Sequence, residues 1–162
     1  MAEEDVAKVT EDRITWTHIL PFSSKLIVAS GDKKGYVGLW DVDNRANGGD
    51  DGIYKYRPHV GNICNIHCNE HSLYDQRVYT SSYDGTIRCI NLGSNTFDLV
   101  YEMSDDMSDV ALIDVHFSPF DDNIVFLGRS DGRATMVDQR MGVSTGSGSG
   151  SSGGSGSGSG SG

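Results

Sequence analysis

The chain repeats itself about every 49 residues, and this repeat limits its fold more than any other feature. In the segments "ITWTHILP", "ICNIHCNE" and "LIDVHFSP", the histidines His18, His67 and His116 are 49 residues apart in both steps. Each segment is followed by a second apolar run, by a turn that contains glycine and by a third apolar run. A period of this length indicates one small structural unit that is built three times.

Each unit is predicted to be an antiparallel sheet of four short strands. Runs such as "LIVAS", "RVYTS" and "NIVFL" are rich in β-branched residues, and "GIYKYRPH" and "TFDLVYEM" supply further strands. No helical spacing of apolar residues is sustained over about 12 residues. The Asp-Gly pairs at 84–85 and 131–132 predict type I′ turns, in which both residues take positive φ. The fold class is therefore all-β. A sandwich and a β-propeller both fit, and the period of the repeat favours the propeller.

The pair Trp40-Asp41 is predicted to end a strand rather than to form a catalytic pair. Every unit has a pair of residues at the same place, which begins five residues after the turn glycine. These pairs are Trp40-Asp41, Ile90-Asn91 and Val137-Asp138. A slot that recurs in all three units is explained by the repeat itself.

We expect three blades, at about residues 13–50, 51–95 and 96–142, after an N-terminal segment of residues 1–12. After Thr145 the chain contains only glycine and serine. Such a segment buries no apolar surface and behaves as a flexible coil. We therefore interpret residues 143–162 as an engineered Gly/Ser linker and exclude them from the fold.

Charge and cysteine content restrict the classes of partner. The net charge of −10 argues against nucleic-acid binding by the bulk of the surface, although it leaves room for a local basic face. Three cysteines without a secretory signal are typical of a reducing compartment. Cys64 and Cys68 flank His67, but no second pair of ligands follows at zinc-finger spacing, so no metal site is predicted. No run approaches the roughly 20 apolar residues of a membrane span, so no membrane partner is predicted.

The sequence gives little support to an enzyme and indicates no cofactor. It has neither a G-x-S-x-G nor an H-E-x-x-H motif, and no glycine-rich phosphate loop precedes a helix. The three spaced histidines are explained by their common place in the repeat. We therefore predict a binding module without catalytic activity.

The segments "VASGDKKGYVGLWDVD" and "YTSSYDGTIRCINL" resemble the turn and third strand of the WD-repeat β-propeller family. Over residues 8–142 the chain is similar to the branch of that family related to the small subunit of the damaged-DNA-binding complex. The resemblance implies a nuclear protein that binds DNA or chromatin in the DNA damage response. It also implies a role as substrate receptor of a cullin-4 ubiquitin ligase.

The resemblance also implies site residues. Basic positions that face DNA in this branch match Arg13, Lys33, Lys34 and Arg88. Each has a plainer alternative, since Lys33 and Lys34 can be a solvated turn and Arg88 can pack along its strand. The segment "VDQR" resembles an Asp-x-Arg box that docks the cullin-4 adaptor, with Asp138 orienting the guanidinium of Arg140. It departs from the fuller box at Val137, where tryptophan is usual.

Propellers of this family usually have about seven blades, whereas this chain holds about three. We expect such a fragment to bind a complementary propeller fragment or to self-associate, because each blade is stabilised by its neighbours. The loop with which the damaged-DNA-binding relatives enter the helix has no counterpart here, so selectivity for damage is not expected. Two alternative functions remain: a generic protein–protein scaffold, and an engineered fragment made for folding or assembly, with no activity of its own.

Overall fold

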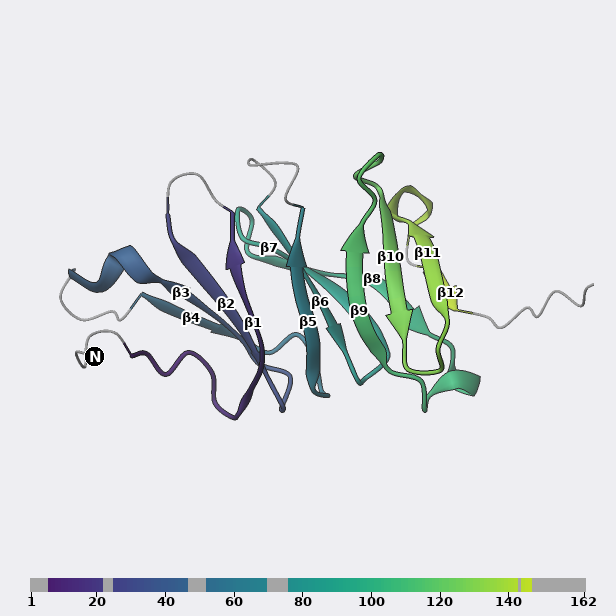
Figure 1. Ribbon diagram of the computed structural model, residues 1–162, viewed down its shortest axis with the longest axis horizontal. Helices are drawn as coiled ribbons and strands as arrows, with labels where there is room; N and C mark the ends of the chain where they lie inside the picture. The colour runs from purple at the N-terminus through teal and green to yellow at the C-terminus, as the bar shows by residue number, and fades with distance from the viewer. Residues whose placement is uncertain (1–5, 22–24, 47–51, 70–75, 143, 147–162) are drawn as a thin grey trace, which may run out of the picture.

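The computed structural model describes residues 6–21, 25–46, 52–69, 76–142 and 144–146, and it consists of three β-sheets in a row (Figure 1). The first sheet has the order β1-β2-β3-β4 and contains β1 (Ile14–Leu20), β2 (Ile27–Asp32), β3 (Val37–Asp41) and β4 (Ile53–Tyr56). The second contains β5 (Ile63–Cys68), β6 (Arg77–Ser82), β7 (Thr86–Asn91) and β8 (Thr96–Met103). The third contains β9 (Leu112–Phe117), β10 (Ile124–Arg129) and β11 (Ala134–Asp138).

The first strands of the sheets lie side by side. β1 contacts β5, and β5 contacts β9, so that the three sheets radiate from adjoining inner strands (Figure 1). Within each sheet, neighbouring strands along the chain pair antiparallel. The only helices in the described ranges are the short 3₁₀ turns η2 (Val42–Ala46), η3 (Asp105–Met107) and η4 (Gln139–Met141). The prediction of an all-β, incomplete propeller is confirmed.

The hydrophobic core lies between the sheets in two layers. One layer joins the first sheet to the second, through residues such as Ala29, Val37, Ile63, Ile66 and Val78. The other joins the second sheet to the third, through Tyr79, Ile87, Leu112, Val115 and Leu127. Each layer needs both of its sheets, because a single twisted sheet cannot bury its own apolar face.

The sheets are offset by one strand from the sequence units. β4 pairs with β3, and β8 pairs with β7, so each of these strands completes the sheet that precedes it. Among the described residues the third sheet has three strands. β12 (Ser144–Gly146) pairs in parallel with β8, so this piece of the expected linker is part of a sheet, while residues 147–162 lie outside the described residues.

The turns between the second and third strands differ from the prediction. Gly35, Gly85 and Gly132 have positive φ, but among the described residues the only other residue type with positive φ is asparagine, at Asn95. The aspartates of the Asp-Gly pairs therefore do not take the conformation that a type I′ turn requires. In each turn the glycine N–H donates to a carbonyl three residues earlier, as in Gly85 to Ser82 at 3.2 Å. This is a type I turn followed by one left-handed glycine.

The repeated pairs do end their strands. β3 ends at Asp41, β7 at Asn91 and β11 at Asp138. Asp41 is buried, and its Oδ2 accepts a hydrogen bond from Lys25 Nζ at 2.7 Å. The side-chain Oδ1 of Asn91 accepts from the backbone N–H of Gly93 at 3.0 Å. The polar residue in this slot thus ties the strand end to a neighbouring segment, which precedes β2 for Asp41 and follows β7 for Asn91.

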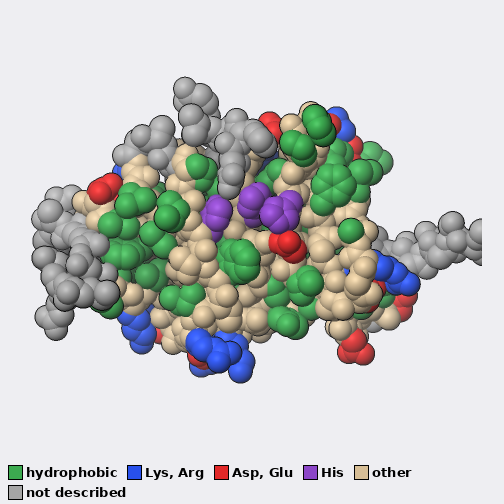
Figure 2. Space-filling view, in the orientation of Figure 1, with side chains coloured by type: hydrophobic (Ala, Val, Ile, Leu, Met, Phe, Trp, Pro, Cys, Tyr) green, Lys and Arg blue, Asp and Glu red, His purple; other side chains and the backbone are tan. Residues whose placement is uncertain are grey.

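The three spaced histidines form a row across the inner strands (Figure 2). The ring centroids of His18 and His67 are 5.7 Å apart, and those of His67 and His116 are 4.9 Å apart. The common position in each strand therefore brings the three rings together. In the described part of the chain no group of three or more His, Cys, Asp or Glu side chains is arranged to hold a metal ion. No helix there is long and apolar enough to cross a membrane.

Candidate nucleic-acid interface and docking box

The loops at one end of the sheets form the candidate interface, which we call the turn face. It consists of the β2–β3, β6–β7 and β10–β11 turns and of the loops that lead into β1, β5 and β9. These segments lie along the lower edge of Figure 1. Because antiparallel strands alternate in direction, the β9–β10 loop and η4 lie at the opposite end.

Three of the predicted DNA-facing residues lie together on the turn face. The backbone N–H of Lys33 donates to the carbonyl of Arg13 at 3.1 Å, which joins the β2–β3 turn to the segment before β1. Lys34 Nζ lies 3.1 Å from Asp12 Oδ2. We call Arg13, Lys33 and Lys34 the basic turn cluster. Figure 2 shows Lys and Arg side chains gathered at this edge of the molecule.

Asp32 holds the basic turn cluster in place. Its side chain is buried, and its Oδ1 accepts from the backbone N–H groups of Lys34 and Tyr36 at 2.8 and 2.9 Å. Its Oδ2 accepts from the backbone N–H of Asp12 at 2.9 Å. The backbone N–H of Arg13, together with Lys34, in turn holds the pKa of Asp12 below its usual range. One buried carboxylate therefore fixes two segments that are 20 residues apart in the chain.

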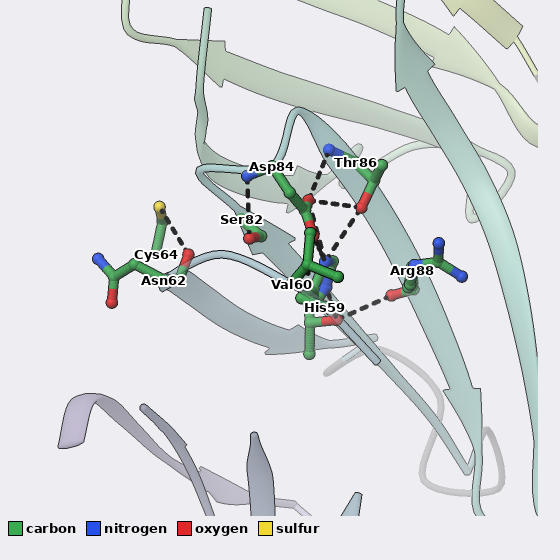
Figure 3. Close-up of polar contacts among 9 residues, drawn as sticks. His59, Val60, Asn62, Cys64, Ser82, Asp84, Thr86 and Arg88 are labelled. Atoms are coloured by element: carbon green, nitrogen blue, oxygen red, sulfur yellow. Dashed lines mark hydrogen bonds and ion pairs between the residues drawn. The ribbon is translucent and has the colours of Figure 1, made fainter. Parts of the chain in front are cut away.

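Arg88 lies apart from this cluster. It is in the middle of β7, opposite Thr80 on β6 and Leu99 on β8, and it is half-buried. Its Nε is buried and has no hydrogen-bond partner. Figure 3 shows its side chain leading away from the group around His59. Arg88 therefore stays a predicted contact that the fold does not bring beside Arg13 and Lys33.

A buried network around His59 connects the loop before β5 to the β6–β7 turn (Figure 3). His59 Nδ1 lies 3.0 Å from Asp84 Oδ2, and its Nε2 lies 2.8 Å from Thr80 Oγ1. Asp84 Oδ2 also accepts from the backbone N–H of Val60 at 3.0 Å, and Asp84 Oδ1 accepts from Thr86 Oγ1 at 2.7 Å. The side chain of His59 is fully buried. The network therefore positions loops and offers no reactive group to solvent.

The network changes the acidity of the groups in it. Burial on its own raises the pKa of Asp84, but the hydrogen bond and charge of His59 outweigh it and hold that pKa far below its usual range. Nearby, burial and the charge of Asp84 raise the pKa of Cys64 to about 12. The Cys64 thiol is therefore protonated at neutral pH and is a poor nucleophile or metal ligand.

No role was assigned to His59 from the sequence. A signal was present, because His59 falls outside the 49-residue spacing of His18, His67 and His116. Its partners lie 21 to 27 residues further along the chain. No local spacing rule connects such positions, so the network became visible only in the fold.

The predicted docking box lies at the opposite end, where β11 gives way to η4. The guanidinium of Arg140 donates from Nε to Asp138 Oδ1 at 2.8 Å and from Nη2 to Asp138 Oδ2 at 2.6 Å. Asp138 Oδ1 also accepts from the backbone N–H of Arg140, and Asp121 Oδ2 lies 3.3 Å from Nη2. The hydrogen bonds to Arg140 hold the pKa of Asp138 below its usual range. The guanidinium is thus held in one orientation while half of it remains exposed.

These features define the class of the protein. Sheets of short antiparallel strands that radiate from adjoining inner strands, with a Trp-Asp or equivalent pair at the end of the third strand, are those of a WD-repeat β-propeller. The chain belongs to the WD-repeat family.

Individual relatives narrow this class. The chain is 40% identical over 107 residues to WD repeat-containing protein 76 of Xenopus laevis. This alignment covers 65% of this chain and 18% of that protein. It is 31% identical over 140 residues to WD repeat-containing protein 76 of Rhinolophus ferrumequinum, in an alignment that covers 86% of this chain and 21% of that protein. It is 30% identical over 129 residues to DNA damage-binding protein CMR1 of Scheffersomyces stipitis, in an alignment that covers 77% of this chain and 25% of that protein. The chain thus spans about a fifth of the length of these relatives.

Two further comparisons bear on the fold. No family model matches the chain. Among solved structures, the computationally designed Ika8 protein aligns with a TM-score of 0.56 at 22% sequence identity, over 84% of this chain and 36% of that one. At this identity the similarity supports the fold alone.

Proposed function

We propose that the turn face binds DNA, and that this chain is a non-enzymatic piece of a nuclear WD-repeat protein that acts on DNA or chromatin in the damage response. One observation carries the proposal: the contact between Lys33 and Arg13 joins basic residues from two segments into one cluster. The printed name of the CMR1 relatives, DNA damage-binding protein, supports the same class of ligand.

The basic turn cluster suits a phosphate backbone physically. Lysine and arginine side chains that neutralise phosphates release condensed counterions, so binding weakens linearly with the logarithm of salt concentration. The rest of the chain is acidic and repels DNA. This repulsion orients the protein so that its turn face points toward the DNA as the two approach. Contacts of this kind position a duplex and do not read its sequence.

Charge reversal tests this role. Lys33→Glu should lower the affinity for duplex DNA severalfold and reduce the salt slope by about 1, measured by fluorescence anisotropy over a salt series. Arg140→Glu is the matched control, because it makes the same change of charge at the opposite end of the sheets. The proposal fails if Lys33→Glu leaves affinity and slope at the wild-type values, or if both variants weaken binding equally.

A second role is favoured by the geometry of Arg140. We infer that Asp138 and Arg140 dock a protein of the cullin-4 adaptor class, because Asp138 and Asp121 engage Nε and Nη2 and leave Nη1 of the oriented guanidinium to donate to a carboxylate or carbonyl of the partner. Arg140→Ala should reduce recovery of the adaptor in a pull-down. Arg133→Ala removes another exposed, ion-paired arginine, which lies in the β10–β11 turn of the same sheet, and should leave recovery unchanged. Equal recovery with wild type and Arg140→Ala would reject the docking role.

A further inference from the structure

Two apolar side chains project from the turn face at the second sheet. Val60, in the loop before β5, is 82% exposed, and Tyr83, in the β6–β7 turn, is 57% exposed. The second sheet has a neighbouring sheet on each side, so their exposure does not arise at an end of the row. We call Val60 and Tyr83 the apolar ledge.

The apolar ledge is held rigidly from below. The backbone N–H of Val60 donates to Asp84 Oδ2 at 3.0 Å, and the backbone N–H of Tyr83 donates to the carbonyl of Asn62 at 3.0 Å. Figure 3 shows Val60 beside Asp84, with the buried His59 beneath them. Backbones fixed in this way lose little entropy when a ligand binds, which favours affinity.

The apolar ledge adjoins the basic turn cluster. The backbone N–H of His59 lies 3.4 Å from the carbonyl of Gly35, so the β2–β3 turn touches the loop that carries Val60. The approach is so close that a Cβ added at Gly35 would lie 2.9 Å from the carbonyl oxygen of Gly61. The turn that carries the cations and the loop that carries Val60 are thus in direct contact.

The carboxylates between these two groups already have partners within the protein. Asp84 is 9% exposed and pairs with His59, and Asp32 is buried within its own turn. Asp12 pairs with Lys34. What this surface offers to a ligand is therefore positive charge next to a flat aromatic ring.

A ligand that matches this surface carries negative charge at intervals and an exposed flat apolar group. A nucleic-acid strand with an unpaired base has both, and sites for single strands combine a cationic track with aromatic stacking in this way. A continuous duplex keeps its base faces stacked inside and would leave the apolar ledge without a contact.

We propose that the ring of Tyr83, flanked by Val60, stacks on an unpaired base of DNA whose phosphates contact the basic turn cluster. This inference rests on the proposed DNA-binding function and specifies its ligand: DNA with an unpaired or single-stranded base, in preference to a continuous duplex. Tyr83 supplies the stacking surface, and Val60 limits how the base can slide across it.

The test uses the 162-residue chain and three fluorescent DNA probes of matched sequence: a duplex, the same duplex with one extra unpaired base, and the single strand. Wild type should bind the bulged and single-stranded probes roughly tenfold more tightly than the duplex. Tyr83→Ala should lower the affinity for the bulged and single-stranded probes to that for the duplex, and so remove this preference. Tyr83→Phe keeps the ring and should keep the preference. Phe120→Ala, which removes an aromatic ring that is 95% exposed at the opposite end, should also keep it.

The outcomes distinguish a failure of this inference from a failure of the proposed DNA-binding function on which it rests. If the wild type binds all three probes equally, and Tyr83→Ala does the same, the inference is wrong while DNA binding stands. If the wild type binds none of the probes, both are wrong. Loss of the preference in Phe120→Ala as well as in Tyr83→Ala would also overturn the inference, because stacking would not then be specific to the apolar ledge.

Discussion

Asp84, although almost fully buried, connects the loops that make up the turn face at the second sheet. Its carboxylate accepts hydrogen bonds from the Val60 backbone and the Thr86 hydroxyl while it pairs with His59. Removal of one partner of a buried ion pair leaves the other without compensation, which is more costly than the pair itself is stabilising. The shape of the β6–β7 turn therefore depends on a carboxylate that is almost fully buried.

Asp84→Asn should lower the free energy of unfolding by about 3 kcal/mol at pH 7, measured by urea denaturation. The folded-state pKa of Asp84 lies below the ordinary value of about 3.9, so the unfolded chain takes up a proton first as the pH falls. The contribution is complete above about pH 4 and is lost as the pH falls through the folded-state pKa. The difference between wild type and variant should therefore shrink below pH 4.

Asp109→Asn serves as the control, because Asp109 is exposed in the loop before β9. It should unfold like the wild type at every pH. A difference between wild type and Asp84→Asn that stays constant from pH 7 to pH 3 would contradict the assigned ionisation.

At this scale the sequence identified which residue types matter but not which of them meet. Arg13 and Lys33 were predicted because the resemblance matches them to basic, DNA-facing positions, and the contact between them depends on Asp32, to which the sequence analysis gave no role. His59 was not assigned a role because burial of a polar side chain depends on the packing of whole loops. Arg88 was grouped with the others by the resemblance, with packing along its strand as the alternative, and the strand register places it in mid-sheet.

At the scale of the element, the turn glycines serve two purposes. All three take a positive φ, which favours glycine at that place in the turn. Only some of them also lie against the neighbouring sheet. A Cβ at Gly35 would overlap the carbonyl of His59, whereas a Cβ at Gly132 would meet nothing within 4 Å. The sequence predicted the glycines and the hairpins, but it could not distinguish a turn that touches the next sheet from one that does not.

This difference gives a matched pair of substitutions. Gly132→Ala should cost about 1–2 kcal/mol, the penalty of a Cβ at positive φ alone. Gly35→Ala has almost the same φ, +85° against +81°, but must also push the turn away from the His59 loop, for a further cost of about 1–3 kcal/mol. Chemical denaturation of both variants measures the difference. Equal losses would show that the contact between the β2–β3 turn and the loop contributes nothing.

At the scale of the whole molecule, the repeat period predicted the architecture because each unit is one sheet that needs a neighbour. The period could not reveal that β4 and β8 complete the preceding sheets, since strand pairing is a long-range contact. The outer sheets show the same dependence on neighbours. Phe126 and Met136 lie opposite each other on β10 and β11 and are 44% and 64% exposed. Ile14 and Trp16 on β1 are also exposed.

We expect these faces to drive association of the 162-residue chain, because an exposed apolar sheet face is stabilised when a second surface covers it. Met136 points away from the core that buries its neighbour Val137, so Met136→Lys places a charge on the outer face of the third sheet. It should lower the association constant about tenfold, because binding would then desolvate an ammonium group. Size-exclusion chromatography with light scattering, run over a concentration series, measures the association.

Met141→Lys is the control for this experiment. Met141 is 81% exposed in η4, beyond the end of β11, so the substitution adds the same charge outside the sheet face. It should leave the association constant at the wild-type value. A wild-type chain that is monomeric at every concentration would refute the expectation, and an equal effect of the two substitutions would show that charge alone, and not the sheet face, controls association.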